Sequence, residues 1–364
     1  MGFFNIIRKK EEPIKSYEDF WNWFQQNEKT FFKVVMEDGN IVKDFLDKIA
    51  CKLNELKDGF YYLAGKLNEN TAELILTADG IVKNIVFVEE LLKVAPKIDG
   101  WKFTVLKPPL DICNYAIEME GYVFSSDNLF FYSNDKSDYP DEIDLTIAHN
   151  DFNNENSSII TKGIYIFLEN FLGELNFITT IDAIEVTRSD KAQRDLIPIE
   201  KLKDYLIWRQ KEFIEKYKGV RYNTDQDSYF ILEGDLENGS RILATINQNL
   251  LSWDRKASHP WIAEIEIKYD GIKRDGMPNE ETYLALNEIE DNILEELKDV
   301  DGYLNIGRKT AKGVRTVYFA CQEFRKPSMV LYNIELKYSK SFKINYDIFK
   351  DKYWQAFKGF EESH

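Results

Sequence analysis

Two hydrophobic periodicities alternate along the chain, and they constrain its fold more than any other feature. Residues 143–147 and 261–267 alternate apolar and polar side chains, which is the period of a strand with one buried face. Leu286, Ile289 and Ile293 instead follow the spacing of an amphipathic helix. Because such segments interleave along the whole chain, we predict the α+β class, with mainly antiparallel sheets that carry helices on one face.

The chain length of 364 residues predicts two domains. We place an N-terminal tail at residues 1–15, an α+β domain ending in a linker helix at residues 16–218, and a ferredoxin-like α+β domain at residues 219–364. The boundary follows a charged amphipathic helix that finishes at Gly219, after which a strand-rich pattern starts again.

Several local patterns make predictions that a structure tests directly. Ser16 and Asp19 have the spacing of a helix capping box. The apolar run at residues 177–186 predicts a strand that closes the first domain. Glu237-Asn238-Gly239 predicts a tight hairpin turn, and Pro278-Asn279 followed by glutamates predicts the start of a helix.

The chain is acidic, with 63 Asp and Glu against 47 Lys and Arg, a net charge of −16 and a pI near 4.9. Direct binding to nucleic acid requires clustered basic side chains, so this charge disfavours it. An acidic surface suits a basic protein partner, such as a nuclease or toxin whose nucleic-acid groove it covers. An acidic protein that imitates nucleic acid is an alternative, for which the excess of carboxylates is thin.

Cysteine and histidine are too few and too dispersed for the sites that they usually form. Cys51, Cys113 and Cys321 lie far apart and build no disulfide framework or paired metal motif, which fits a reducing compartment. His149 and His259 lie in no recognisable catalytic motif. These observations argue against a structural zinc site and against serine or cysteine catalysis.

No apolar run approaches the roughly 18 residues that a membrane helix needs. The segment Met1–Lys10 has its apolar residues before its basic ones, the reverse of a signal peptide. Two interpretations of it stay open: a frayed end or strap packed on the domain, which we favour, and a peptide that touches a membrane surface. We expect a cytoplasmic protein without a transmembrane segment.

The sequence lacks the motifs of nucleotide and metal sites. It has no P-loop and no dinucleotide-binding glycine motif, and Lys312-Gly313 and Asp275-Gly276 are explained as turns. We therefore assign no catalytic, cofactor-binding or metal-binding residue and expect no cofactor.

Carboxylates are the one abundant chemical resource of the chain. Glu169 and Glu174 flank the end of a helix and would form an acid–base pair if both pointed inward. The acidic loop Asp135–Asp144 has enough carboxylates for a cation, but its spacing is not that of a calcium loop and favours a solvated loop. A further set of carboxylates is expected on the solvent face of the helix around Ile289. These are Glu288, Glu290, Asp291, Glu295 and Glu296.

A group of aromatic residues near the start of the alternating strand has two interpretations. Trp253, Trp261 and Tyr269, with His259-Pro260 beside them, either line a groove for a ligand or partner or belong to the core. Aromatic side chains at strand spacing favour the core.

Four motifs occur together in the C-terminal stretch: His259-Pro260-Trp261, Gly276-Met277-Pro278, Asn287–Asp291 and Tyr353-Trp354. With them, residues 220–360 resemble the bacterial domain-of-unknown-function family numbered 695. That family has no established activity, so the resemblance implies a fold unit and no chemistry. The layout is also similar to the ferredoxin-like regulator that inhibits ribonuclease E, which is an analogy of fold alone.

Upstream motifs resemble a second uncharacterised bacterial module that often precedes this family. They are Leu76–Gly80, Ala95-Pro96, Gly100–Phe103 and Leu172-Gly173-Glu174. We interpret the chain as a bacterial, cytoplasmic, non-enzymatic protein-interaction or regulatory protein with an acidic surface. The alternatives are a carboxylate-dependent hydrolase and a membrane-surface scaffold anchored by the N-terminal segment.

Overall fold

The computed structural model describes residues 13–37, 39–111, 115–236, 239–271 and 274–361. The chain separates into two compact units, residues 1–108 and residues 109–364. Within the described residues, no helix is long and apolar enough to cross a membrane. The predicted tail at residues 1–15, the hairpin turn at Glu237-Asn238 and Cys113 lie mostly or wholly outside the described residues.

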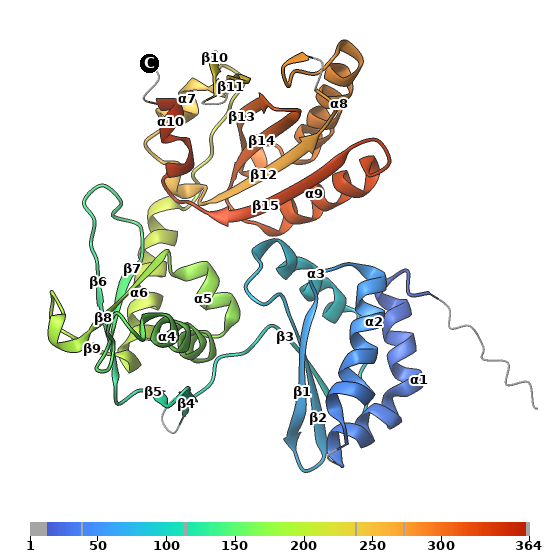
Figure 1. Cartoon of the computed structure of the whole chain (residues 1–364), viewed down its shortest axis with the longest axis vertical. Helices are drawn as coiled ribbons and strands as arrows, with labels where there is room; N and C mark the ends of the chain where they lie inside the picture. Colours follow the sequence, from blue (N-terminus) through green and yellow to red (C-terminus); the bar gives the residue numbers. More distant parts are fainter. Residues whose placement is uncertain (1–12, 38, 112–114, 237–238, 272–273, 362–364) are drawn as a thin grey trace, which may run out of the picture. The chain divides into compact units, whose positions relative to one another are not determined.

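The first unit is a three-stranded sheet with helices (Figure 1). Its sheet has the order β1-β2-β3, with β1 and β2 antiparallel and β2 and β3 parallel. The parallel pair arises because a helix connects its strands. The elements are α1 (Tyr17–Met36), a π-helical turn (Val42–Leu46), α2 (Asp47–Leu56), β1 (Tyr61–Asn68), β2 (Thr71–Thr77), α3 (Val82–Lys93) and β3 (Trp101–Val105).

Aromatic side chains fill the core of this first unit. Phe24 of α1 packs against Trp101 and Phe103 of β3, with ring centroids 5.1 and 5.2 Å apart. The start of α1 is fixed by the predicted capping box, since Ser16 and Asp19 accept hydrogen bonds from each other's backbone N–H groups. That prediction is therefore confirmed.

The second unit begins with a β-hairpin and a four-stranded sheet of order β8-β7-β6-β9, in which β7 and β8 run parallel. Its strands are β4 (Ala116–Met119), β5 (Tyr122–Ser125), β6 (Leu129–Ser133), β7 (Asp144–His149), β8 (Ala183–Arg188) and β9 (Ile197–Pro198). Its helices are α4 (Ser157–Leu172), α5 (Glu174–Thr180) and α6 (Leu202–Tyr217).

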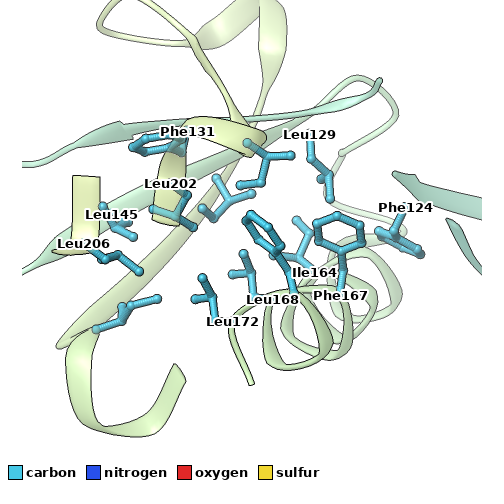
Figure 2. Close-up of a cluster of buried hydrophobic side chains, with 14 of the residues drawn as sticks. Phe124, Leu129, Phe131, Leu145, Ile164, Phe167, Leu168, Leu172, Leu202 and Leu206 are labelled. Atoms are coloured by element: carbon cyan, nitrogen blue, oxygen red, sulfur yellow. The ribbon is translucent and has the colours of Figure 1, made fainter. Parts of the chain in front are cut away.

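The core of this sheet lies between its strands and the helices α4 and α6 (Figure 2). Phe131 and Leu145 of the sheet meet Phe167 of α4 and Leu206 of α6 there. The strand predicted at residues 177–186 is wrong in its first half, because α5 continues to Thr180 and the strand begins at Ala183. Over so short a run, a pattern of apolar residues is compatible with a helix as well as with a strand.

The second unit ends with a six-stranded antiparallel sheet of order β10-β11-β13-β14-β12-β15. Its strands are β10 (Tyr229–Asp235), β11 (Arg241–Asn247), β12 (Trp261–Lys268), β13 (Tyr303–Ala311), β14 (Val314–Cys321) and β15 (Lys343–Lys350). Its helices are α7 (Gln248–Leu251), α8 (Glu280–Glu296), α9 (Arg325–Tyr338) and α10 (Lys358–Glu361).

From β12 to β15 the elements follow one another as βαββαβ, with the fourth, first, third and second strands side by side. This is the ferredoxin-like arrangement, and the hairpin β10–β11 extends it beside β13. The turn at Lys312-Gly313 has positive φ at both residues and joins β13 to β14, as the sequence predicts. The α+β class with antiparallel sheets is confirmed.

The division after Pro108 is one that the sequence analysis did not predict. Residues 16–218 hold two larger sheets in two different units, instead of the one sheet expected for the first predicted domain. The boundary between residues 218 and 219 lies inside the second unit, between α6 and β10, and stays a prediction. Pro108-Pro109 follows β3 closely, and a proline pair that ends a strand also suits a linker.

A buried ionic cluster joins the two sheets of the second unit. Lys350, at the end of β15, and Lys352 both donate to the carboxylate of Asp182, at 2.8 and 2.7 Å. Burial would raise the pKa of Asp182, but the two ammonium groups outweigh it and hold that pKa below its ordinary value. Beside this cluster, Asp141 accepts hydrogen bonds from Tyr217 of α6 and from Tyr353.

This cluster predicts opposite roles for two of its members. Asp182→Asn would leave two buried ammonium groups without a carboxylate, and should lower the free energy of unfolding by about 3 kcal/mol. Lys350→Met removes one of two cations that share a single carboxylate, so it should cost less than about 1 kcal/mol. Equilibrium urea unfolding at neutral pH, followed by circular dichroism, measures both. Equal losses for the two variants would contradict this account.

Candidate functional site

The structure does not bring the predicted acid–base pair together at a cavity. Glu169 is half-buried in α4, and Glu174 is fully buried at the first position of α5. Neither side chain lines either of the two cavities described below. No observation in the described part of the chain therefore supports a hydrolase that uses these two residues.

The acidic loop Asp135–Asp144 is divided among separate basic partners. Asp135 pairs with Arg194 at 3.0 Å, Asp141 pairs with Lys216 at 2.8 Å, and Asp144 pairs with a different lysine, Lys136. Among the described residues, no three His, Cys, Asp or Glu side chains are grouped so that they could hold a metal ion.

The aromatic group around His259 is divided between two places. Trp253 packs against His259 and Trp354 with ring centroids 5.4 and 6.2 Å apart, within the core on the face of the sheet opposite α8 and α9. Trp261 points to the other face, where its ring meets Phe324 at 4.9 Å. Burial lowers the pKa of His259 to about 4, so its imidazole is neutral at pH 7.

A polar groove lies on the helix-covered face of the six-stranded sheet, between α8 and the strands β10, β11 and β13. Its volume is about 450 Å³. The opening exists because the helices do not cover β10, whose residues Tyr229 and Ile231 are 48% and 69% exposed on that face. The polar side chains that line this groove are Thr224, Thr245, Asn287, Glu290, Asp291, Asn305 and Arg308.

A β-bulge in β13 assembles the floor of this groove. The register between β13 and β14 shifts between Asn305 and Gly307, so the alternation of faces changes phase there. Asn305 and Arg308 consequently both face α8, although a regular strand would put them on opposite faces. Gly307 has φ +142°, and a Cβ atom there would lie 2.2 Å from the carbonyl oxygen of Thr245, so the bulge requires glycine.

Two arginines and one glutamate join the sheet to α8 beneath the groove. Arg308 donates to Glu290 at 2.7 Å, and Arg315 donates to Asn287 at 2.8 Å. Arg315 is 2% exposed, and its guanidinium lies 5.2 Å from the centre of the Tyr283 ring. Burial lowers the pKa of Arg315, whereas for Arg308 the attraction of Glu290 outweighs burial and raises the pKa.

The placement of Glu290 corrects the sequence analysis. The solvent face predicted for the carboxylates of α8 is wrong for Glu290, which is buried against Arg308. Glu290 follows Leu286 by four residues and precedes Ile293 by three, so its position on the buried stripe was available as a signal. Asn305, Arg308 and Arg315 could not be found in this way, because the pairing of their strands and the bulge bring them together.

One polar atom in this groove has no hydrogen-bond partner. The Nδ2 atom of Asn305 is buried, and no acceptor lies within reach among the described residues. A buried amide donor without an acceptor costs free energy, and a ligand that supplies an oxygen would recover it. A ligand with an acceptor oxygen in the groove would therefore satisfy a donor that the described chain leaves unpaired.

The unpartnered amide predicts a stabilising substitution. Asn305→Leu replaces the lone donor with an apolar side chain of similar size, so the free energy of unfolding should rise by about 1 kcal/mol. Urea unfolding of the variant and the wild type measures the change. A loss of stability would show that the side chain of Asn305 is already satisfied within the folded chain.

Comparison with known proteins gives a family for one part of the chain and no function. No curated protein and no solved structure matches it. The family model that matches is described only as a family of unknown function, DUF695. Its match includes α8, the bulge in β13 and both arginines of the groove. Residues 236–360, the C-terminal part of the chain, are thus confirmed as matching the family of unknown function DUF695.

Proposed function

We propose that the chain is a protein-interaction protein that holds an extended, basic segment of a partner in the groove beside α8. The observation that carries this proposal is the charge of the groove wall. The charged side chains that line the groove are two carboxylates, Glu290 and Asp291, and one arginine, Arg308. The helix α8 and the turn after it, residues 280–301, contain nine carboxylates and a single basic residue, Lys298. A segment rich in Lys and Arg would be drawn to this wall and would be distinguished there from an acidic one.

Exposed apolar side chains on α8 and β10 would supply contact area for the partner. Leu284 and Leu294 of α8 are exposed, and Tyr229 and Ile231 of β10 are exposed on the same face of the sheet. A surface that combines exposed apolar side chains with charge fits a partner that alternates basic and apolar residues.

The strand β10 favours an extended segment. It lies at the edge of the sheet, and among the described strands it pairs only with β11. An edge strand accepts another strand through its free backbone groups, and alternate side chains of the added strand would then lie over the groove. Within the groove, the Asn305 amide would donate to a carbonyl oxygen of the bound segment.

Selection of peptides from a random dodecapeptide library against the full chain tests this proposal. The selected sequences should be enriched in Lys and Arg that alternate with apolar residues, and their affinity should fall by about tenfold from low to high salt. Selected peptides without a basic bias, or binding that salt does not change, would contradict the proposal.

Two matched charge-reversal variants test whether the peptides bind in the groove. Asp291→Lys, at the groove wall, should lower the affinity for the selected peptides by about tenfold. Glu212→Lys makes the same charge change at an exposed position of another helix, α6, and should leave affinity unchanged. Isothermal titration calorimetry measures both. Equal effects of the two substitutions would show that only net charge matters and that the groove is not the site.

A further inference from the structure

A second cavity, of about 350 Å³, lies inside the second unit between its two sheets. The helices α5 and α6 form one side of this junction cavity, through residues such as Thr179, Arg209 and Phe213. The ends of the six-stranded sheet form the other side, through Trp261 and Lys350 among others. The junction cavity shares no lining residue with the groove beside α8.

Basic side chains are the majority of the charged residues that line the junction cavity. Four of them line it, against two carboxylates, Asp141 and Glu323. Two further carboxylates outside the lining act on its lysines: Asp182 pairs with both, and the charge of Glu142 acts on both. The four basic residues are Arg209, Arg325, Lys350 and Lys352. The lining itself thus carries more basic than acidic side chains, although the net charge of the chain is −16.

The two carboxylates of the lining are occupied by other hydrogen bonds. Asp141 accepts from Lys216 at 2.8 Å, and also from two tyrosine hydroxyls. Glu323 accepts from the hydroxyl of Tyr303 at 2.7 Å and from the backbone N–H groups of Arg325 and Lys326. Lys350 and Lys352 share the carboxylate of Asp182, and the charge of Glu142 also acts on both lysines.

Flat and apolar side chains form the rest of the wall. Phe213 of α6 faces the cavity from one side, and Trp261 and Phe324 line it from the other. The rings of Trp261 and Phe324 meet edge to face with centroids 4.9 Å apart. A pocket with an aromatic wall and a few converging charges is typical of a site for a small organic molecule.

From this lining we infer that the junction cavity binds a small organic anion, with its carboxylate, sulfonate or phosphate at Lys350 and Lys352 and its planar apolar part against Trp261 and Phe324. The two ammonium groups share one paired carboxylate, that of Asp182, so each keeps hydrogen-bonding capacity for the anionic group of a ligand. Binding of this kind is independent of the peptide groove and does not rest on the proposed function.

Titration with anilinonaphthalene sulfonate, a fluorescent planar anion, tests the inference on the full chain. The dye should bind at one site per chain. Lys350→Met keeps the volume of the side chain and removes its charge, and should weaken binding by about tenfold. Lys343→Met removes the same charge from an exposed position at the other end of β15 and should leave binding unchanged.

A pair of competitors separates charge from apolar contact. Naphthoate should displace the dye, whereas naphthamide, its neutral counterpart, should do so at least about tenfold less well. The near-ultraviolet circular dichroism of Lys350→Met should match that of the wild type, which excludes dye binding to a loosened fold. Binding unchanged in Lys350→Met, equal competition by naphthamide, or a dependence on Asp291→Lys instead would overturn the inference.

A pH profile gives a second readout. Burial lowers the pKa of Lys350 to about 8 against the attraction of Asp182. Lys352 and Glu142 also act on its charge. The other charged side chains of the same cavity lining are Arg209, Arg325, Asp141 and Glu323. Because the sulfonate stays ionised, affinity for the dye should fall as Lys350 loses its proton, between about pH 7 and about pH 10. The affinity of Lys350→Met should stay nearly constant over that range, and parallel profiles would count against the site.

Discussion

The β-bulge at Gly307 is the constraint on which the groove depends. Leu304 and Ile306 belong to the core on the far face of the sheet, so an unbroken alternation would also send Arg308 to that face. The shift of register turns Arg308 toward α8, where it reaches Glu290 at 2.7 Å. Because the carbonyl oxygen of Thr245 occupies the space beside Gly307, a side chain there would push apart β11 and β13. The ion pair between Arg308 of the sheet and Glu290 of α8 thus depends on the conformation of one glycine.

The two cavities of the second unit differ in the charge of the side chains around them. In the groove, Glu290 neutralises Arg308, and the outer wall of α8 is acidic. In the junction cavity, two lysines share one carboxylate, and burial keeps the pKa of Lys350 low. An acidic chain can hold both environments because buried charges respond to their nearest partners, while net charge acts mainly over the solvated surface. The groove therefore suits a cation-rich partner, and the junction cavity suits an anion.

The sequence predicts the elements of this fold better than their assembly. The strict alternation at residues 261–267 and the capping box at Ser16 depend on neighbours in the sequence, and both predictions hold. The expected strand at residues 177–186 fails at its start, because its apolar run suits a helix equally well. Glu290 was misplaced because an acidic residue on the apolar stripe of a helix is buried only where an arginine from another strand meets it. That arginine is brought there by sheet order and by the bulge, which local spacing does not encode.

The family match covers most of the groove lining but only one side of the junction cavity. Residues 236–360 include all the described lining residues of the groove except Thr224 and Tyr229. The junction cavity takes α5, α6 and the loop at Asp141 from outside that range, and only its other side comes from within it. A segment that folds as the matched part alone would therefore keep the floor and wall of the groove but would leave Lys350 and Lys352 without Asp182 and open to solvent. The floor of the groove and its α8 wall thus lie within the matched range, its edge strand β10 lies just before that range, and the junction cavity requires the preceding sheet as well.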